Sequence, residues 1–300
     1  MSNDKDMGGR AFLKNSIGIV DWVEKDEVIA DLLIHEDTLA IHPMDQGFEA
    51  EVMKISSTKE SFVLKVWNKS SKPDIHFQYR LLKVLFEQGV PVPKPLGWGI
   101  NPDGDKVLLT TFDGAPILKV NGKKMTELAK VFSSIHQIHV EEIGDIQLPK
   151  YDFIDYFFPR VREHHDIYQA LIFLVQNVQI KQEQIIHGDF HLRNILEKND
   201  RNTVIDWTNG QLGDLRYDFA WSLILQKIYV SDRYANVFRS AYLLENNIQQ
   251  NELEIFEALA CLRWILLNRT GGVPRGPSTI KRVKSLLINN SLLKEFELAI

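Results

Sequence analysis

Two carboxylates and one amide that could take part in catalysis or metal binding lie within the stretch that runs from Ile185 to Trp221. Asp189 and Asn194 are five residues apart in a polar turn, and Asp206 follows a second short apolar segment. Such groups are costly to bury unless they hold a cation or a hydroxyl. Magnesium takes one or two oxygens from a protein and the rest from phosphates and water. Asn194 and Asp206 can supply those protein oxygens, which leaves Asp189 to accept a hydrogen bond from an attacking hydroxyl.

The pattern around these residues predicts a hairpin-like arrangement that carries them at its loop ends. One apolar run ends at His187, and an apolar return follows at Ile195 and Leu196. A turn is predicted over 197–202 and a buried strand over 203–205. For any single residue, an ordinary turn of a polar hairpin is the better explanation. The ordered set of two carboxylates and one amide favours the catalytic interpretation.

The segment H-G-D-F-H-L-R-N followed by I-D-W resembles the catalytic segment of the aminoglycoside phosphotransferase family, which includes choline-kinase-like enzymes. Protein kinases, distant relatives of that family, carry the related elements H-R-D-x-x-x-x-N and D-F-G. The resemblance implies that Asp189 is the catalytic base and that Asn194 and Asp206 are the magnesium ligands. Further on, G-D-L-R-Y-D matches the family's G-D-x-x-x-D segment, whose last residue, here Asp218, usually braces the catalytic loop.

The N-terminal part of the chain predicts a helix near 21–34 and two strands over 38–41 and 48–55. The turn between these strands, 42–47, contains Gly47. A glycine in such a turn lets backbone N–H groups approach phosphates closely. A single glycine is equally typical of an ordinary hairpin turn, so its role as a nucleotide contact depends on the segments that follow.

The next strand, Ser61–Trp67, alternates along S-F-V-L-K-V-W and carries Lys65 in its middle. A lysine there is more often simply solvated, but in the family a strand lysine at this place holds the nucleotide's phosphates. A helix is predicted over 73–88, opened by Pro and Asp and ended by Gly. In the family this helix carries a glutamate that pairs with the lysine. The matching position here is Gln78, a departure for which Asp74 is the candidate substitute.

An apolar strand over 107–110 is followed by T-F-D-G-A, residues 111–115, which ends it. A plain turn is the alternative explanation for this segment. By resemblance it is the hinge between two lobes, where Thr111 and Phe112 contact the nucleotide base.

A helix is also predicted over 126–139. Its residues His136 and His139 are three apart and could suggest a metal pair, but no third ligand stands near them in the sequence. A structural role is therefore expected for both. The region 218–300 has helical periodicity, interrupted at 271–277 by G-G-V-P-R-G-P.

Acidic residues are frequent in the segments that form the acceptor pocket in the family. They could attract a cationic amine, or they could simply form a solvated helix surface, and the sequence leaves both interpretations open. The residues are Asp152, Asp155, Glu163, Asp166, Asp232, Glu245, Glu252, Glu254 and Glu257.

Composition sets the broad class of the protein. The chain has 300 residues, 44% hydrophobic and 25% charged, which is typical of a globular protein with a substantial core. A net charge of -5 without a long basic run argues against a nucleic-acid partner. A lone cysteine, Cys261, fits a reducing cytoplasm. The chain starts with a polar segment and contains no long apolar run, so we expect no signal peptide and no membrane partner.

These observations together predict an α+β, bilobal protein-kinase-like fold. Residues 1–110 are expected to form a nucleotide-binding N-lobe of sheet and helix, 111–115 the hinge, and 116–300 a mainly helical C-lobe. The expected activity is transfer of the γ-phosphoryl of ATP or GTP, with magnesium, to a hydroxyl of a small molecule. Two alternatives stay open: a kinase-fold pseudoenzyme that binds nucleotide without turnover, and a metabolic kinase for choline, an amino alcohol or a sugar.

Overall fold

The computed structural model describes residues 17–44 and 50–300. Residue contacts divide the chain into two compact units, Met1–Gly114 and Ala115–Ile300. The division falls within 111–115, whose role as a hinge stays a prediction. Gly47 lies outside the described residues. Within the described ranges, no helix is long and apolar enough to span a membrane.

The first unit is built on a six-stranded antiparallel sheet with the strand order β1-β5-β6-β4-β3-β2. The predicted strand Ser61–Trp67 is confirmed with these bounds as β4, in the interior of the sheet. The other strands are β1 (Asp21–Lys25), β2 (Ala40–Pro43), β3 (Glu51–Ser56), β5 (Pro95–Ile100) and β6 (Lys106–Thr111).

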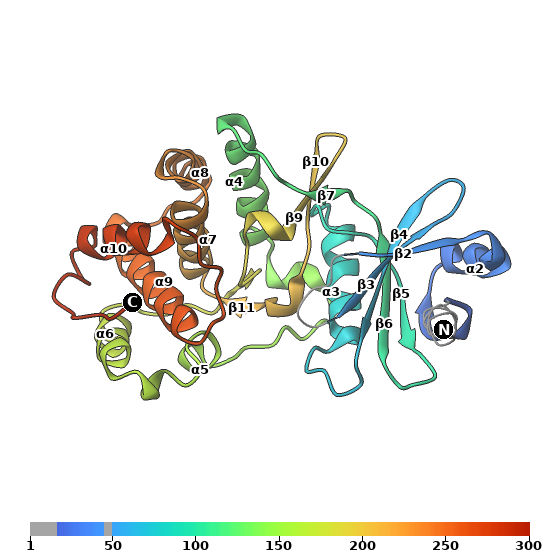
Figure 1. Cartoon of the computed structure of the whole chain (residues 1–300), viewed down its shortest axis with the longest axis horizontal. Helices are drawn as coiled ribbons and strands as arrows, with labels where there is room; N and C mark the ends of the chain where they lie inside the picture. Colours follow the sequence, from blue (N-terminus) through green and yellow to red (C-terminus); the bar gives the residue numbers. More distant parts are fainter. Residues whose placement is uncertain (1–16, 45–49) are drawn as a thin grey trace, which may run out of the picture. The chain divides into compact units, whose positions relative to one another are not determined.

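Helices cover both faces of this sheet (Figure 1). On one face, a core that includes Leu64 and Val66 packs against α2 (Glu27–Ile34) and the short 3-10 helix η1 (Ile17–Ile19). Because side chains alternate along a strand, Lys65 projects from the opposite face. That face packs against α3 (Ile75–Glu87), which contacts β5 and β6. A further 3-10 helix, η2, spans Glu36–Thr38.

The predicted helix over 21–34 is wrong in its first part. Residues Asp21–Lys25 form the edge strand β1, and α2 begins only at Glu27, where Asp26 caps it by accepting hydrogen bonds from backbone N–H groups. The exposed edge strand shows no clear alternation of apolar residues, so its sequence gives little sign of a strand. The predicted helix over 73–88 is confirmed as α3, with Asp74 as its N-cap.

The second unit is mainly helical (Figure 1). Helices α7 and α9 pack on each other and are buried around most of their circumference, as expected of central helices. This arrangement of a sheet-based first unit and a helical second unit confirms the predicted α+β class. The α-helices are α4 (Gly122–His136), α5 (Phe153–Phe157), α6 (His165–Gln176), α7 (Leu215–Tyr229), α8 (Asp232–Glu245), α9 (Gln250–Arg269) and α10 (Thr279–Asn289), and the 3-10 helices are η3 (Val140–Ile143), η4 (Val161–Glu163), η5 (Leu192–Asn194) and η6 (Trp207–Asn209).

Two small antiparallel sheets in this unit hold the predicted catalytic stretch. In one, β8 (Gln184–Ile186) pairs with β11 (Gln211–Gly213). In the other, the hairpin of β9 (Ile195–Lys198) and β10 (Arg201–Val204) extends to β7 (Ala115–Pro116) through β9.

The hairpin turn is shorter than the predicted 197–202. Only Asn199 and Asp200 lie outside the paired strands, and both have positive φ, at 51° and 63°. Asn and Asp tolerate this left-handed conformation, which suits the two-residue turns that match strand twist. The strand predicted over 203–205 is accordingly longer at its start, because pairing begins at Arg201.

Candidate active site

Asp189 lies in the loop between β8 and η5, and two side chains fix its carboxylate. Trp221 on α7 donates its indole N–H to Oδ1 at 2.9 Å. The ring of His191 lies with Nε2 3.3 Å from Oδ2. Since Nδ1 of His191 accepts the backbone N–H of Arg193 at 3.2 Å, its proton is on Nε2 and points to Asp189. Asp189 is partly exposed, and each of its carboxylate oxygens is oriented by a donor.

The backbone before Asp189 is held by Asp218, as the resemblance implies. Oδ2 of Asp218 accepts the backbone N–H of His187 at 2.8 Å, and Oδ1 accepts that of Gly188 at 3.0 Å. The buried ring of His136 on α4 contacts Oδ2 at 3.1 Å and the hydroxyl of Tyr242 on α8 at 2.5 Å. The expectation of a structural role is confirmed for His136. Helices α4, α7 and α8 thus converge on this loop.

His187 links the two segments of the site through its side chain. Its Nδ1 accepts the backbone N–H of Asp189 at 3.2 Å, so Nε2 carries the proton and donates to the carbonyl of Ile205 at 3.0 Å. Burial lowers the pKa of this imidazole, which keeps the ring neutral in that tautomer. The loop that contains Asp189 and the segment that leads to Asp206 are thereby joined by one side chain.

Gly188 is the residue that this turn requires. Its φ is +78°, a conformation that side chains rarely adopt. A Cβ at this position would also lie 2.7 Å from Cβ and 2.9 Å from the backbone oxygen of Asn209. Conformation and close packing both exclude a larger residue beside Asp189.

Arg263 on α9 lies behind the loop. It donates from Nη1 to the carbonyl of Gly188 at 3.2 Å. Its guanidinium carbon lies 4.1 Å from the ring centre of Trp221 and 4.8 Å from that of Phe157, within the range of cation–π attraction. Only 9% of Arg263 is exposed, so its positive charge acts in a poorly screened environment.

The pKa of Asp189 lies below its ordinary range. Burial alone would raise it, but the His191 and Trp221 hydrogen bonds and the Arg263 charge outweigh that effect. The carboxylate is therefore ionised at neutral pH and ready to accept a hydrogen bond.

The predicted metal ligands Asn194 and Asp206 lie on adjacent segments. Asn194 donates from Nδ2 to the carbonyl of Asp189 at 3.1 Å, and its backbone carbonyl accepts the N–H of Ile205 at 2.9 Å. Its side-chain oxygen has no hydrogen-bond partner among residues 17–44 and 50–300. Asp206 is exposed in a left-handed conformation, with φ at 64°, and only its Oδ1 accepts a hydrogen bond in the described part of the chain, from Thr208 at 2.8 Å.

The oxygens left by Asn194 and Asp206 fit a hard cation such as magnesium, which accepts few protein ligands and several from water or phosphate. The described ranges contain no group of three or more His, Cys, Asp or Glu side chains that could hold a metal. The role of Asn194 and Asp206 as metal ligands stays a prediction.

In the first unit, the predicted nucleotide contacts lie on β4, α3 and the end of β6. Lys65 is half-buried on β4, and Gln78 is 6% exposed on α3. The backbone N–H groups of Thr111 and Phe112 donate to the carbonyls of Lys94 at 3.0 Å and Ser61 at 3.1 Å. Both donors are thus used within the first unit, so the role of these two residues as nucleotide contacts stays a prediction.

The candidate substitute for a glutamate partner, Asp74, has another role. Its Oδ1 accepts the backbone N–H of Phe77 at 3.1 Å, as the N-cap of α3. Substituting such a cap typically costs about 1 kcal/mol of stability. A structural reason for an acid at position 74 therefore exists without Lys65.

Four of the nine acidic residues considered as an amine-attracting group form ion pairs within the described part of the chain. Each of the four is paired with an arginine or a lysine, which reduces the negative field that a cationic substrate would meet. The pairs are Glu163 with Arg160, Asp166 with Arg269, Glu252 with Arg216, and Glu257 with Lys227.

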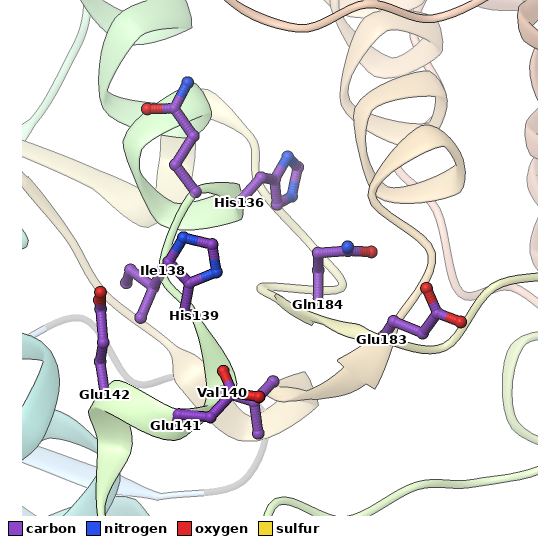
Figure 2. A pocket seen from close by; sticks show the side chains of 9 residues that line it. His136, Ile138, His139, Val140, Glu141, Glu142, Glu183 and Gln184 are labelled. Atoms are coloured by element: carbon purple, nitrogen blue, oxygen red, sulfur yellow. The ribbon is translucent and has the colours of Figure 1, made fainter.

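A separate pocket in the second unit lies at the end of α4, beside η3 and the start of β8 (Figure 2). Its lining includes His136, His139, Glu141 and Glu183. None of the predicted catalytic or metal-binding residues borders it. Its link to the catalytic loop is His136, whose ring contacts Asp218.

Sequence reasoning did not identify Trp221 or Arg263. Trp221 is three residues after Asp218, and this spacing on a helix places both on one face, so a signal existed. Arg263 is 75 residues from Gly188, whose carbonyl it contacts. Nothing in the sequence indicates that contact.

Several known structures share the fold of this chain. Spectinomycin phosphotransferase in complex with ADP and spectinomycin matches with a TM-score of 0.56 and 16% identity, covering 92% of this chain and 95% of that one. Ethanolamine kinase of Plasmodium vivax matches with a TM-score of 0.57 and 15% identity, over 96% of this chain and 95% of that one. Amicoumacin kinase, in complex with AMP-PNP, Ca²⁺ and its ligand Ami, matches with a TM-score of 0.62 and 13% identity, over 95% and 92%.

These likenesses confirm the predicted protein-kinase-like fold. In addition, the family model of the Phosphotransferase enzyme family matches residues 40–252. That match spans more than half of the chain and includes the loop of Asp189, both predicted metal ligands and the bracing residue Asp218. The protein is therefore a member of the phosphotransferase enzyme family.

Proposed function

We propose that this protein transfers the γ-phosphoryl group of ATP or GTP, with magnesium, to a hydroxyl of a small molecule. The observation that carries the proposal is the arrangement around Asp189. One ionised carboxylate is oriented by two donors, and Asn194, fastened to the backbone of Asp189, keeps its side-chain oxygen available beside the segment that ends in Asp206.

In this mechanism Asp189 accepts a hydrogen bond from the acceptor hydroxyl and orients its oxygen toward the γ-phosphorus. As the new P–O bond forms, the bond to the β-phosphate oxygen breaks, the nucleoside diphosphate leaves, and the hydroxyl proton passes to Asp189 and then to solvent. Because the transition state is loose, positioning and charge neutralisation matter more than basicity. A carboxylate whose pKa is low suits that role.

Asn194 and Asp206 would hold the magnesium ion with their side-chain oxygens. When bound, magnesium supplies neutralisation of charge on the phosphate oxygens. Asp206 contributes a charged ligand and Asn194 a neutral one, so we expect the loss of Asp206 to weaken the metal site more.

The nucleotide contacts proposed for the first unit are Lys65, Gln78, Thr111 and Phe112, with Gly47 as a further candidate. Binding of ADP or AMP-PNP by spectinomycin phosphotransferase and amicoumacin kinase supports a nucleotide as phosphoryl donor. The same two proteins are bound to spectinomycin and to Ami, whereas another structural relative is an ethanolamine kinase. The acceptor is accordingly proposed only as a small hydroxyl compound.

The test is a nucleotide-consumption screen over aminoglycosides, macrolides, amino alcohols and sugars, with ATP and GTP and with and without magnesium. We expect magnesium-dependent consumption with at least one acceptor, reduced by about two to four orders of magnitude in Asp189→Asn. Nucleotide binding should survive in that variant. Binding without consumption by the unmodified protein would instead support the pseudoenzyme alternative.

The metal assignment is tested by titrating nucleotide with and without magnesium. Asp206→Ala should abolish the magnesium-dependent tightening of binding, and Asn194→Ala should weaken it less. Unchanged metal dependence in both variants would overturn the assignment.

A further inference from the structure

We propose that Trp221 and Arg263 act as one positioning unit that holds Asp189 in its reactive orientation. The inference rests on the proposed function and adds two residues to it. Neither is assumed to touch the acceptor or the nucleotide. They act on Asp189 from two sides, through its carboxylate and through the backbone before it.

Trp221 supplies the directional contact. Its indole N–H can only donate, and it donates to Oδ1 of Asp189 at 2.9 Å. The side chain is 2% exposed on a central helix, so the ring has little freedom to turn away. A donor fixed in this way leaves Oδ2 as the oxygen that faces His191 and, in the proposed mechanism, the acceptor hydroxyl.

Arg263 keeps both partners in place. No carboxylate lies within ion-pair distance of its guanidinium in the described part of the chain, although burying an unpaired cation is costly. The compensating contacts include the faces of Trp221 and Phe157 and the carbonyl of Gly188. Two of these three contacts lead directly to Asp189, one through the indole and one through the peptide that precedes it.

The chain offers a matched control for the indole contact. Trp264, the residue after Arg263 on α9, is also fully buried and donates its indole N–H at 2.9 Å, but to the hydroxyl of Tyr229. Trp264→Phe therefore removes a hydrogen bond of equal length from a similar environment without touching Asp189. The comparison separates positioning of Asp189 from a general loss of packing.

The first experiment compares the kinetics of Trp221→Phe and Trp264→Phe, using the acceptor found by the screen. Trp221→Phe should lower kcat about ten- to a hundred-fold, the range for losing a hydrogen bond to a charged group, while KM for the nucleotide changes less than about threefold. Trp264→Phe should leave kcat within about threefold of the unmodified protein. Equal effects of the two substitutions on kcat would overturn the proposal.

Two substitutions of Arg263 separate the role of its charge from that of its planar guanidinium group. Arg263→Met should lower kcat with KM for the nucleotide preserved, and Arg263→Lys, which keeps the charge, should restore part of the loss. If Arg263→Met does not fold, Arg263→Lys alone remains informative, because Lys lacks the planar stacking group. A kcat for Arg263→Lys equal to that of the unmodified protein would overturn the stacking role.

A spectroscopic test does not depend on turnover, so its failure is distinguishable from failure of the proposed activity. The protein has six tryptophans, and the Phe variants assign the indole N–H signals of Trp221 and Trp264 in a ¹⁵N–¹H spectrum. Asp189→Asn should shift the Trp221 signal and leave that of Trp264 unchanged. A Trp221 signal that is insensitive to Asp189→Asn would overturn the contact on which the proposal is built.

Discussion

The backbone N–H of His187 donates to the carboxylate of Asp218 at 2.8 Å across 31 residues of sequence. Gly188 adds a second bond to the same carboxylate. One buried side chain therefore determines where the peptide before Asp189 can lie, and the shape of the loop depends on a residue that takes no part in the reaction.

Asp218→Asn should reduce both stability and turnover. An amide presents one NH₂ group toward two backbone donors, so at least one buried N–H loses its acceptor, which costs about 1–3 kcal/mol. Urea unfolding and kcat measured at a temperature where the variant is folded check this. Asp214→Asn is the control, because Asp214 is similarly buried but bonds Arg216 and the backbone of Lys181 instead. Full turnover by folded Asp218→Asn would contradict the bracing role.

Gly188→Ala should destabilise the second unit and reduce kcat. The positive φ costs a side chain roughly 1–2 kcal/mol, and the contact with Asn209 adds to that cost. Gly271→Ala separates the two contributions, because Gly271 has φ +79° and a Cβ there would meet nothing within 4 Å. We expect a larger loss of unfolding free energy for Gly188→Ala. Equal losses would show that the loop moves to admit the methyl group.

Gln78→Glu tests the predicted pairing with Lys65. If the two side chains meet, the new charge should improve nucleotide affinity by up to about tenfold, and Lys65→Met should remove that benefit. If they do not meet, the buried new carboxylate should lower the unfolding free energy. A double-mutant cycle on nucleotide affinity decides the matter, since strict additivity would mean that the helix has been aligned wrongly with the family.

Asp166 should contribute stability above about pH 4 and lose that contribution in acid. The Arg269 guanidinium lowers the pKa of this carboxyl from 3.8 to about 2. Because the folded-state pKa is lower, the unfolded chain binds protons first as the pH falls, and the stabilisation disappears as the pH approaches 2. The ion pair of Asp166 contributes at most about 2 kcal/mol to the free energy of unfolding.

Urea unfolding of the unmodified protein and Asp166→Asn between pH 7 and pH 2 measures this contribution. The difference in unfolding free energy should be constant at neutral pH and narrow below about pH 4. A difference that grew in acid would rule out the ion pair as its source.

Local patterns in the sequence predicted those parts of the fold whose residues carry a regular signal. β4 alternates and lies inside the sheet, and α3 begins at an acidic cap and ends before a glycine. β5 was not predicted, because Pro95, Gly97 and Gly99 interrupt its apolar pattern. Gly97 has a tertiary reason, since a Cβ there would lie 2.6 Å from the carbonyl of Glu24 on β1. The glycines that allow β1 to approach closely thus give β5 a composition typical of a loop.

The residues of the candidate site also fall into two groups, those that the sequence predicts and those that it does not. Asp189, Asn194 and Asp206 follow one another within a short stretch, so their order and spacing pointed to shared chemistry. Arg263 reaches that stretch from α9, and its contacts depend on how helices pack. Residues of this second kind are determined by tertiary structure and leave no periodic or motif signal.

The convergence of His136, Asp218 and Tyr242 beneath the catalytic loop has a consequence for folding order. These residues belong to α4, α7 and α8, and the contact between His136 and Tyr242 spans 106 residues. Contacts of such sequence separation form late, after the cost of closing long loops has been met. We therefore expect the loop of Asp189 to acquire its native shape only once the helices beneath it have docked. During refolding, recovery of activity should coincide with the last cooperative phase of helix assembly and should not precede it.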